Sequence, residues 1–231
     1  MRSFDTYRHI VVLTGAGISR SAGLATYRGP GGLWTDEDKA KLSDVAALRA
    51  RPEEVCGMFW TFRNAIVAAR PTEAHRALAA FEQRLPAGTS FTLLTQNVDG
   101  LHQAAGSRNV CELHGSLRTW RCEACGEAVQ PVGDEAPRHC GALMRPGVVL
   151  FGEMLGVETE RTMKHALREC DLFVGIGTSG TVEPAASLVR WAQLNRARTV
   201  IANLEIDDGM RALYGETHAG ESDALVPKLF A

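Results

Sequence analysis

Short glycine-containing and polar motifs that follow apolar runs are the parts of this 231-residue chain best suited to do chemistry. The first is Gly15-Ala16-Gly17-Ile18-Ser19, which follows a run of β-branched residues. Glycines at a turn between a strand and a helix let a diphosphate approach the backbone N–H groups at the helix start. The spacing departs from GxGxxG, and no acidic residue ends the next expected strand, so an ordinary turn remains an alternative interpretation.

A second motif, residues 95–102, has the sequence TQNVDGLH and follows another apolar run. The side chains of Gln96, Asn97 and Asp99 supply donors and acceptors suited to an amide and to hydroxyl groups. An Asx-type turn that caps a helix would use the same residues. The residues alone therefore leave open a polar pocket or such a turn.

A histidine that could act as a general base stands at position 114, between a short apolar stretch and Gly115. Imidazole titrates near neutral pH, so His114 could accept a proton during a reaction. His102, in the second motif, is the competing histidine. For either one, a histidine with an ordinary structural role is the alternative.

Three of the six cysteines lie close together, at Cys122, Cys125 and Cys140. The Cys122-x-x-Cys125 spacing resembles one half of a zinc ribbon, but a proline stands at position 137, where the second half would begin. His139 adjoins Cys140, although neighbouring residues rarely point at one metal. Three sulfurs with a water, a fourth ligand from His139, or no metal at all remain open. We expect the other three cysteines to be small buried side chains: Cys56, Cys111 and Cys170.

Four apolar runs should form the strands that position these motifs: residues 10–14, 91–95, 172–176 and 199–202. Continuous apolar runs are typical of parallel strands covered on both faces. Helical patterns lie between them, at residues 73–85, 158–169 and 183–195. This alternation predicts a doubly wound α/β sheet, in which ligands bind at the carboxyl ends of the strands. The motifs GAGIS, TQNVDG, GIGTS and NLE would then meet at one edge and form a single site.

Two segments interrupt the alternation, residues 29–64 and residues 115–146. The first is rich in loop residues and then helical, and the second holds the clustered cysteines with little periodicity. We expect both to form a smaller second lobe. The main domain would then be discontinuous, made of residues 1–28, 65–114 and 147–231.

The composition is that of an ordinary globular protein, with 45% hydrophobic and 23% charged residues, which excludes a disordered or collagen-like chain. With 25 basic and 27 acidic residues, nothing attracts the chain to nucleic acid or to an anionic membrane. No apolar run approaches the roughly 20 residues of a membrane helix, and the N-terminus lacks the zones of a signal peptide. We expect a cytoplasmic monomer with no nucleic-acid or membrane partner.

Taken in order, these motifs resemble the sirtuin family. The matching stretches run from residue 15 to about residue 205 and are GAGIS, TYRG, TQNVDGLH, ELHG, the CxxC segment, RPGVVLFGE, GTS and NLE. No single stretch is decisive, but the ordered set is specific. The resemblance implies an inverted Rossmann-like parallel sheet with helices on both faces and a small zinc-ribbon and helical lobe. NAD and an acylated lysine of a protein or peptide would meet in the cleft between them.

The resemblance also implies roles for individual residues. His114 would be the catalytic base of a deacylase that consumes NAD and releases nicotinamide and an O-acyl-ADP-ribose. Val148, Val149 and Phe151 resemble the strand that pairs with the backbone of the substrate. The residues that match the family's NAD contacts are Gly15, Ala16, Gly17, Ser19, Tyr27, Arg28, Trp34, Gln96, Asn97, Asp99, Gly177, Thr178, Ser179, Asn203, Glu205 and Ser222.

The subgroup that this chain most resembles is the bacterial desuccinylase and demalonylase-like class, on TYRGPGGLW and an aromatic-x-x-Arg pattern. In that subgroup a tyrosine, and an arginine three residues later, hold the carboxylate of the acyl group. Here Arg63 is present, but Trp60 replaces the tyrosine, and its indole donates one hydrogen bond from a larger, differently placed ring. Removal of succinyl or malonyl groups, besides acetyl groups, is therefore a hypothesis that depends on Trp60 and Arg63.

Three other functions compete with this one. A NAD glycohydrolase or ADP-ribosyl transferase would use the same cosubstrate without an acyl acceptor. A non-catalytic NAD-binding module would not need His114. An ordinary Rossmann dehydrogenase is disfavoured by the glycine spacing and the missing acidic residue.

Overall fold

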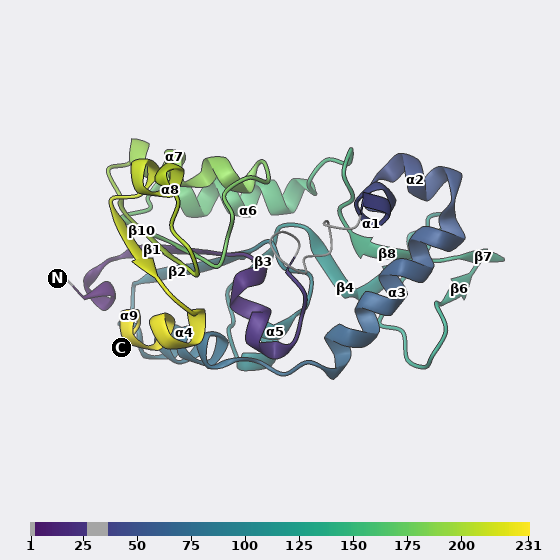
Figure 1. The fold of residues 1–231 in the computed structure, drawn as a ribbon, viewed down its shortest axis with the longest axis horizontal. Coiled ribbons are helices and arrows are strands. Elements are labelled where there is room, and N and C mark those ends of the chain that lie inside the picture. Colours follow the sequence, from purple (N-terminus) through teal and green to yellow (C-terminus); the bar gives the residue numbers. More distant parts are fainter. Residues whose placement is uncertain (1–2, 27–36) are drawn as a thin grey trace.

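A six-stranded parallel sheet forms the centre of the larger lobe in the computed structural model, which describes residues 3–26 and 37–231 (Figure 1). The strand order is β11-β10-β9-β1-β2-β3, and every neighbouring pair is parallel. The strands are β1 (His9–Thr14), β2 (Ser90–Thr95), β3 (Val110–Glu112), β9 (Leu172–Ile176), β10 (Arg198–Asn203) and β11 (Glu216–Ala219). All four predicted strands are present, and the two short edge strands β3 and β11 were not predicted.

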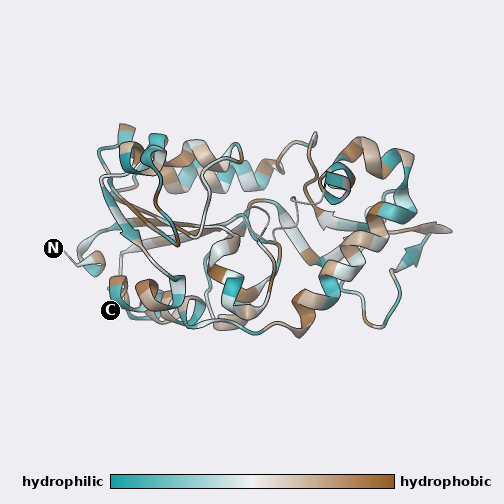
Figure 2. Ribbon diagram, in the orientation of Figure 1, coloured by the Kyte–Doolittle hydropathy of each residue, from teal (hydrophilic) through white to brown (hydrophobic). Residues whose placement is uncertain are grey.

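Helices cover both faces of this sheet, which confirms the predicted fold class (Figure 1). Because side chains alternate across a strand, Val12 packs on one face of the sheet while Val11 and Leu13 pack on the other. The first face is covered by α4 (Glu73–Arg84) and α9 (Ser222–Leu229). The second is covered by α6 (Val157–Arg168), α7 (Leu188–Leu194) and α8 (Asp208–Leu213). Figure 2 shows mostly hydrophobic colouring along the central strands, whereas the helices carry both kinds of residue.

Two expected helices contain 3-10 structure. The GAGIS motif opens a helix as expected, which is the 3-10 helix η2 (Ala16–Ala22). The helical pattern of residues 183–195 begins as a 3-10 turn, η4 (Ala185–Ser187), before α7. The remaining short helices of this lobe are η1 (Phe4–Thr6) and α5 (Leu101–Ala105).

In the described residues, the second lobe combines three helices with small antiparallel sheets (Figure 1). Its helices are α1 (Glu37–Leu42), α2 (Val45–Ala50) and α3 (Pro52–Ala68). Its strands are β4 (Gly115–Arg121), β5 (Ala128–Val129) and β8 (Arg145–Val148) in one sheet, with β6 (Arg138–His139) and β7 (Ala142–Leu143) in a hairpin. A third core joins the two inserted segments, since Val55 and Trp60 of α3 pack with Trp120 of β4 and Met144.

None of the helices in the described part of the chain has the length and apolar character needed to span a membrane. The longest, α3, has 17 residues and includes two glutamates in its first turn.

Candidate active site

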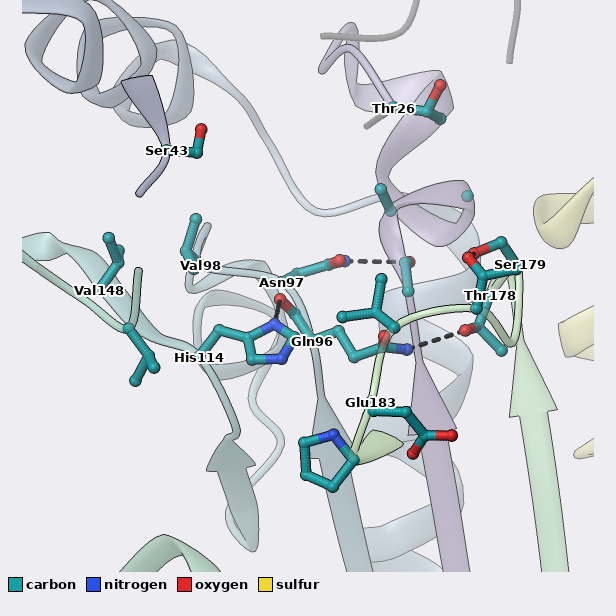
Figure 3. Close-up of a pocket in the computed structure, with 18 of the residues that line it drawn as sticks. Thr26, Ser43, Gln96, Asn97, Val98, His114, Val148, Thr178, Ser179 and Glu183 are labelled. Atoms are coloured by element: carbon teal, nitrogen blue, oxygen red, sulfur yellow. Dashed lines mark hydrogen bonds between the residues drawn. The ribbon is translucent and has the colours of Figure 1, made fainter. Parts of the chain in front are cut away.

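A cavity of about 960 Å³ lies at the carboxyl ends of β1, β2, β9 and β10, where the two lobes meet (Figure 3). The larger lobe contributes the turns that follow these strands, and the second lobe contributes Ser43, Phe59 and the end of β8. The predicted motifs GAGIS, TQNVDG, GIGTS and NLE all contribute residues to this cavity. The volume is at the upper end of the range for small-molecule sites.

The turns after β1 and β9 touch each other at one wall of the cavity, and only glycines permit this contact. The Gly17 amide donates to the Gly177 carbonyl at 2.9 Å. A Cβ at Gly17 would lie 2.7 Å from Gly177 Cα, and one at Gly177 would lie 2.5 Å from the backbone nitrogen of Ile18. Gly177 also has a φ of +59°, a conformation that side chains disfavour. Glycine at these positions is therefore required by the packing of the two turns against each other.

The polar motif after β2 forms the floor of the cavity. Gln96 Nε2 donates to Thr178 Oγ1 at 2.8 Å, and Asn97 Nδ2 donates to the Gly15 carbonyl at 3.1 Å (Figure 3). Asn97 lines the cavity, yet its Oδ1 is buried and has no partner. An unpartnered buried acceptor costs free energy, so a bound N–H or O–H group would stabilise this site.

Ser19 and Asp99, two of the expected NAD contacts, lie behind this floor and do not line the cavity. Their exposed fractions are 2% and 5%. The Ser19 hydroxyl donates to Asp99 Oδ2 at 2.7 Å, and Asp99 Oδ1 accepts from the Leu101 amide at 2.9 Å. These two side chains therefore support Asn97 from below.

His114 follows β3 and lines the cavity. Its Nδ1 lies 3.0 Å from the Gln96 carbonyl (Figure 3). Because a carbonyl only accepts, Nδ1 carries the proton and Nε2 keeps a free lone pair. Burial lowers the pKa of His114, which favours the neutral form that acts as a base. His102 is 1% exposed and bonds Thr14 Oγ1 at 2.9 Å, outside the cavity lining, so the competing histidine is a core residue.

The other end of the cavity carries the residues that follow β9 and β10. Thr178 and Ser179 line it together with Asn203, Glu205 and Ser222. Asn203 Nδ2 donates to the Thr178 carbonyl at 3.3 Å, which joins the two strand ends. Glu205 is exposed, and its carboxylate is suited to accept hydrogen bonds from the two hydroxyls of a ribose.

The end of β8 and the segment after it form another wall, where Val148, Val149 and Phe151 all line the cavity. The Val149 amide donates to the His114 carbonyl at 2.9 Å. Both backbone groups of Phe151 are used by the second lobe, since its amide donates to the Ser43 carbonyl at 2.9 Å and its carbonyl accepts from Val45 at 3.0 Å. A substrate backbone would therefore have to pair with groups other than those of Phe151.

Trp60 and Arg63, the expected ligands of an acyl carboxylate, do not line the cavity. Trp60 Nε1 donates to the Asp134 carbonyl at 2.7 Å, and the Arg63 guanidinium stacks 4.7 Å from the centre of the Trp60 ring. Arg63 also donates to the Pro131 carbonyl. Phe59, one residue earlier on α3, faces the cavity instead. One step along a helix rotates a side chain by about 100°, and nothing in the sequence fixed which aromatic residue would point inward.

The clustered cysteines come together with His139. The ligand atoms of Cys122, Cys125, His139 and Cys140 all lie within 4.8 Å of one another. His139 Nδ1 is 3.4 Å from Cys125 Sγ and 3.2 Å from Cys140 Sγ. Zinc bonds to sulfur and nitrogen in a tetrahedron place neighbouring ligand atoms about 3.5–4 Å apart. The donor set and its spacing therefore fit a structural zinc ion.

The position of His139 next to Cys140 argued against it as a ligand of the same metal. Cys140, however, has a left-handed backbone, with a φ of +50°. Side chains of consecutive residues diverge in extended backbone, whereas a left-handed residue turns the chain back. This turn lets two adjacent residues face one point.

Three expected NAD contacts, Tyr27, Arg28 and Trp34, lie outside the described residues.

Known proteins resemble this chain over most of its length. Residues 15–184 match a family model described as "Sir2 family". A protein of Aquifex aeolicus (strain VF5) named "NAD-dependent protein deacylase" is 42% identical over 203 residues, which cover 85% of this chain and 84% of that protein. A solved complex of a Sir2 homologue with NAD has a TM-score of 0.86 at 34% identity, covering 96% of this chain and 87% of that one. A mutant Sir2 homologue bound to 2'-O-acetyl-ADP-ribose has a TM-score of 0.87 at 34% identity, covering 96% and 90%.

Proposed function

Because this chain belongs to the Sir2 family, we propose that it is an NAD-dependent protein deacylase. Its substrates are NAD, which is consumed, and an acylated lysine of a protein or peptide. Its products are the free lysine, nicotinamide and an O-acyl-ADP-ribose. The single observation that carries this proposal is the free lone pair of His114 Nε2, in a cavity whose other walls are a glycine turn and the segment after β8.

The residues around the cavity divide the binding of NAD between them. The turn of Gly15 and Gly17 lines the cavity and opens a helix, where backbone N–H groups can hold the diphosphate. Glu205 accepts hydrogen bonds from the hydroxyls of the adenosine ribose, and Thr178 and Ser179 line the same end of the cavity. Asn97 Oδ1, the unpartnered acceptor, takes an N–H or O–H of the nicotinamide end.

The chemistry needs one base. The oxygen of the acyl-lysine amide attacks the anomeric carbon of the nicotinamide ribose, and the carbon–nitrogen bond to nicotinamide breaks. His114 Nε2 then accepts the proton of a ribose hydroxyl, whose oxygen attacks the carbon of the former amide. Water completes the release of lysine. The Gln96 carbonyl stabilises His114 as it gains charge, since it holds the other ring proton at 3.0 Å.

We propose that Cys122, Cys125, His139 and Cys140 hold a structural zinc ion. It would crosslink the turn before β5 to the β6–β7 hairpin, and none of these four residues lines the cavity. The metal supplies stability to the second lobe and takes no part in the reaction.

For the acyl group, we propose a preference for a neutral chain such as acetyl. Arg63 and Trp60 are both engaged with the loop between β5 and β6. Arg20 is the only lysine or arginine among the described residues that line the cavity, and it pairs with Glu221 at 3.4 Å. The second-lobe side of the cavity is instead apolar at Phe59 and Val148. An acyl carboxylate would lose water there without gaining a cation from the described residues.

Mass spectrometry of the products tests both parts of the proposal. The chain would be incubated with NAD and peptides that carry acetyl-lysine or succinyl-lysine. We expect O-acetyl-ADP-ribose from the acetyl peptide, loss of product in His114→Gln, and little product from the succinyl peptide. Nicotinamide release that does not depend on peptide would show a glycohydrolase instead. Efficient desuccinylation that is lost in Arg63→Met would overturn the neutral-acyl preference.

A further inference from the structure

Two buried histidines that the proposed reaction does not use lie next to the floor of the cavity. His75 of α4 is 0% exposed and His102 of α5 is 1% exposed, and their ring centres are 4.6 Å apart. His75 is bonded at both ring nitrogens, to Thr72 on one side and Ser19 on the other. Ser19 is the residue that supports Asn97.

The hydrogen bonds of His75 have a defined direction. The Thr72 backbone N–H, which can only donate, points at His75 Nδ1 from 3.3 Å. The Thr72 hydroxyl lies 2.9 Å from the same atom and can donate or accept, so the backbone N–H decides the assignment and makes Nδ1 the acceptor. Burial lowers the pKa of His75 to about 4, which keeps the ring neutral with its proton on Nε2. That proton faces Ser19 Oγ at 3.5 Å.

The donors and acceptors between Ser19 and the cavity can be assigned in the same way. Ser19 must donate to Asp99 Oδ2 at 2.7 Å, because a carboxylate only accepts. Ser19 Oγ is then left to accept from His75 Nε2 and from Asn97 Nδ2, which lies 3.3 Å away. With its amide nitrogen committed to Ser19 and to the Gly15 carbonyl, Asn97 presents Oδ1 as the unpartnered atom at the floor.

We propose that His75 is a positioning residue for NAD. Its Nε2–H holds the Ser19 hydroxyl, which in turn holds the Asn97 amide with its oxygen available to a donor at the nicotinamide end of the dinucleotide. The identity of the ligand rests on the proposed function. The chain of bonds itself rests on the contacts of His75, Ser19 and Asn97.

The competing account gives His75 a structural role only, because its Nδ1 also caps the first turn of α4. Two substitutions separate the two roles, because each one replaces the hydrogen bond of one ring nitrogen and removes that of the other. The amide oxygen of His75→Asn can replace Nδ1 as the acceptor for Thr72, but it has no donor at the position of Nε2. The amide nitrogen of the longer His75→Gln reaches Ser19 as a donor, but the cap on Thr72 is lost.

The experiment measures NAD binding by calorimetry in the full chain without peptide, together with KM for NAD, kcat and thermal unfolding. We expect His75→Asn to keep its stability while its Kd and KM for NAD rise roughly fivefold or more, as for the loss of one buried hydrogen bond. Its kcat at saturating NAD should remain within about twofold, because His114 is untouched. His75→Gln should bind NAD nearly as wild type although it unfolds at a lower temperature.

A double-mutant cycle with Asn97→Ala gives a second measurement. If His75 acts through Asn97, His75→Asn adds no further loss of NAD affinity in the Asn97→Ala background. The inference is overturned if His75→Asn binds NAD as tightly as wild type, or if NAD affinity follows stability in both His75 variants. A wild-type chain that binds NAD without deacylating any peptide would overturn the proposed function and leave these binding results interpretable.

Discussion

Replacing Arg145 with methionine should lower the free energy of unfolding by about 3–5 kcal/mol, because it breaks a buried ion pair by removing one partner. Arg145 begins β8 and is 3% exposed. Its guanidinium donates to both carboxylate oxygens of Glu153, at 2.6 and 2.8 Å, and to the Val148 carbonyl at 3.1 Å. Glu153 Oε2 also accepts from the Leu150 amide at 2.9 Å. These bonds hold the segment that walls the cavity.

The size of the effect depends on what the substitution leaves behind. Methionine fills most of the space of the arginine stem, but the Glu153 carboxylate, 18% exposed, and the Val148 carbonyl lose the guanidinium, and Glu153 keeps only the Leu150 amide as a hydrogen-bond donor. Burial by itself would raise the pKa of Glu153, and the bonds from Arg145 and Leu150 more than offset it, so that the pKa is lowered. A lowered folded-state pKa contributes stability above the unfolded-state pKa, and this contribution is lost as pH falls through the folded-state value. The cost of Arg145→Met should therefore shrink in acid.

Urea unfolding at pH 7.5 and near pH 4 measures this difference. The matched control is Lys164→Met, which breaks the exposed pair with Glu160, whose side chains are 56% and 33% exposed. That control should cost no more than about 0.5 kcal/mol at either pH. A loss below about 1 kcal/mol for Arg145→Met at pH 7.5, or a loss equal to that of Lys164→Met, would refute the reasoning.

Three further predictions test the base, the glycine contact and the metal ligands. The acid limb of the pH profile of kcat/KM should have an apparent pKa below 6.5, because burial lowers the pKa of His114, and His114→Gln should reduce kcat about 100-fold to 10,000-fold. An acid limb above that value would contradict the assignment. Gly177→Ala should abolish NAD binding in calorimetry because its Cβ would lie 2.5 Å from the Ile18 nitrogen, whereas Gly180→Ala, with a φ of +64° but open space, should bind NAD. Equal losses of NAD affinity in the two variants would show that the positive φ, and not the contact with Ile18, causes the effect. His139→Ala should lower the zinc content measured by mass spectrometry and the thermal stability, while a fully loaded variant would remove His139 from the ligand set.

The buried strands could be predicted because burial on both faces demands a continuous apolar run. Residues 172–176 illustrate this, since all five residues of β9 are buried. The edge strands β3 and β11 have only three and four residues and none that is fully buried. They form because β2 and β10 offer unpaired backbone groups, and their own sequences carry no period that would predict them.

The site was predictable in its location but not in the direction of each side chain. Strand ends of a parallel sheet meet at one edge, so the motifs at Gly15, Gln96 and Gly177 had to converge. Whether a residue faces the cavity depends on tertiary packing. Phe59 faces it while Trp60 does not, and Asn97 faces it while Asp99 lies underneath. Spacing in sequence gave no means to separate the members of either pair.

Both lobes determine the position of His114, the proposed base. The ring of His114 bonds the Gln96 carbonyl at the end of β2, and its own carbonyl accepts from Val149, which follows β8. The next residue, Gly115, has a φ of +74°, and a Cβ there would collide with the Gly147 carbonyl of β8. His114 is thus held between the cavity floor, which belongs to the larger lobe, and β8 of the second lobe. The contacts of Arg145 with Glu153 and Val148 restrain the β8 side of this junction, so Arg145→Met should disturb His114 as well as stability.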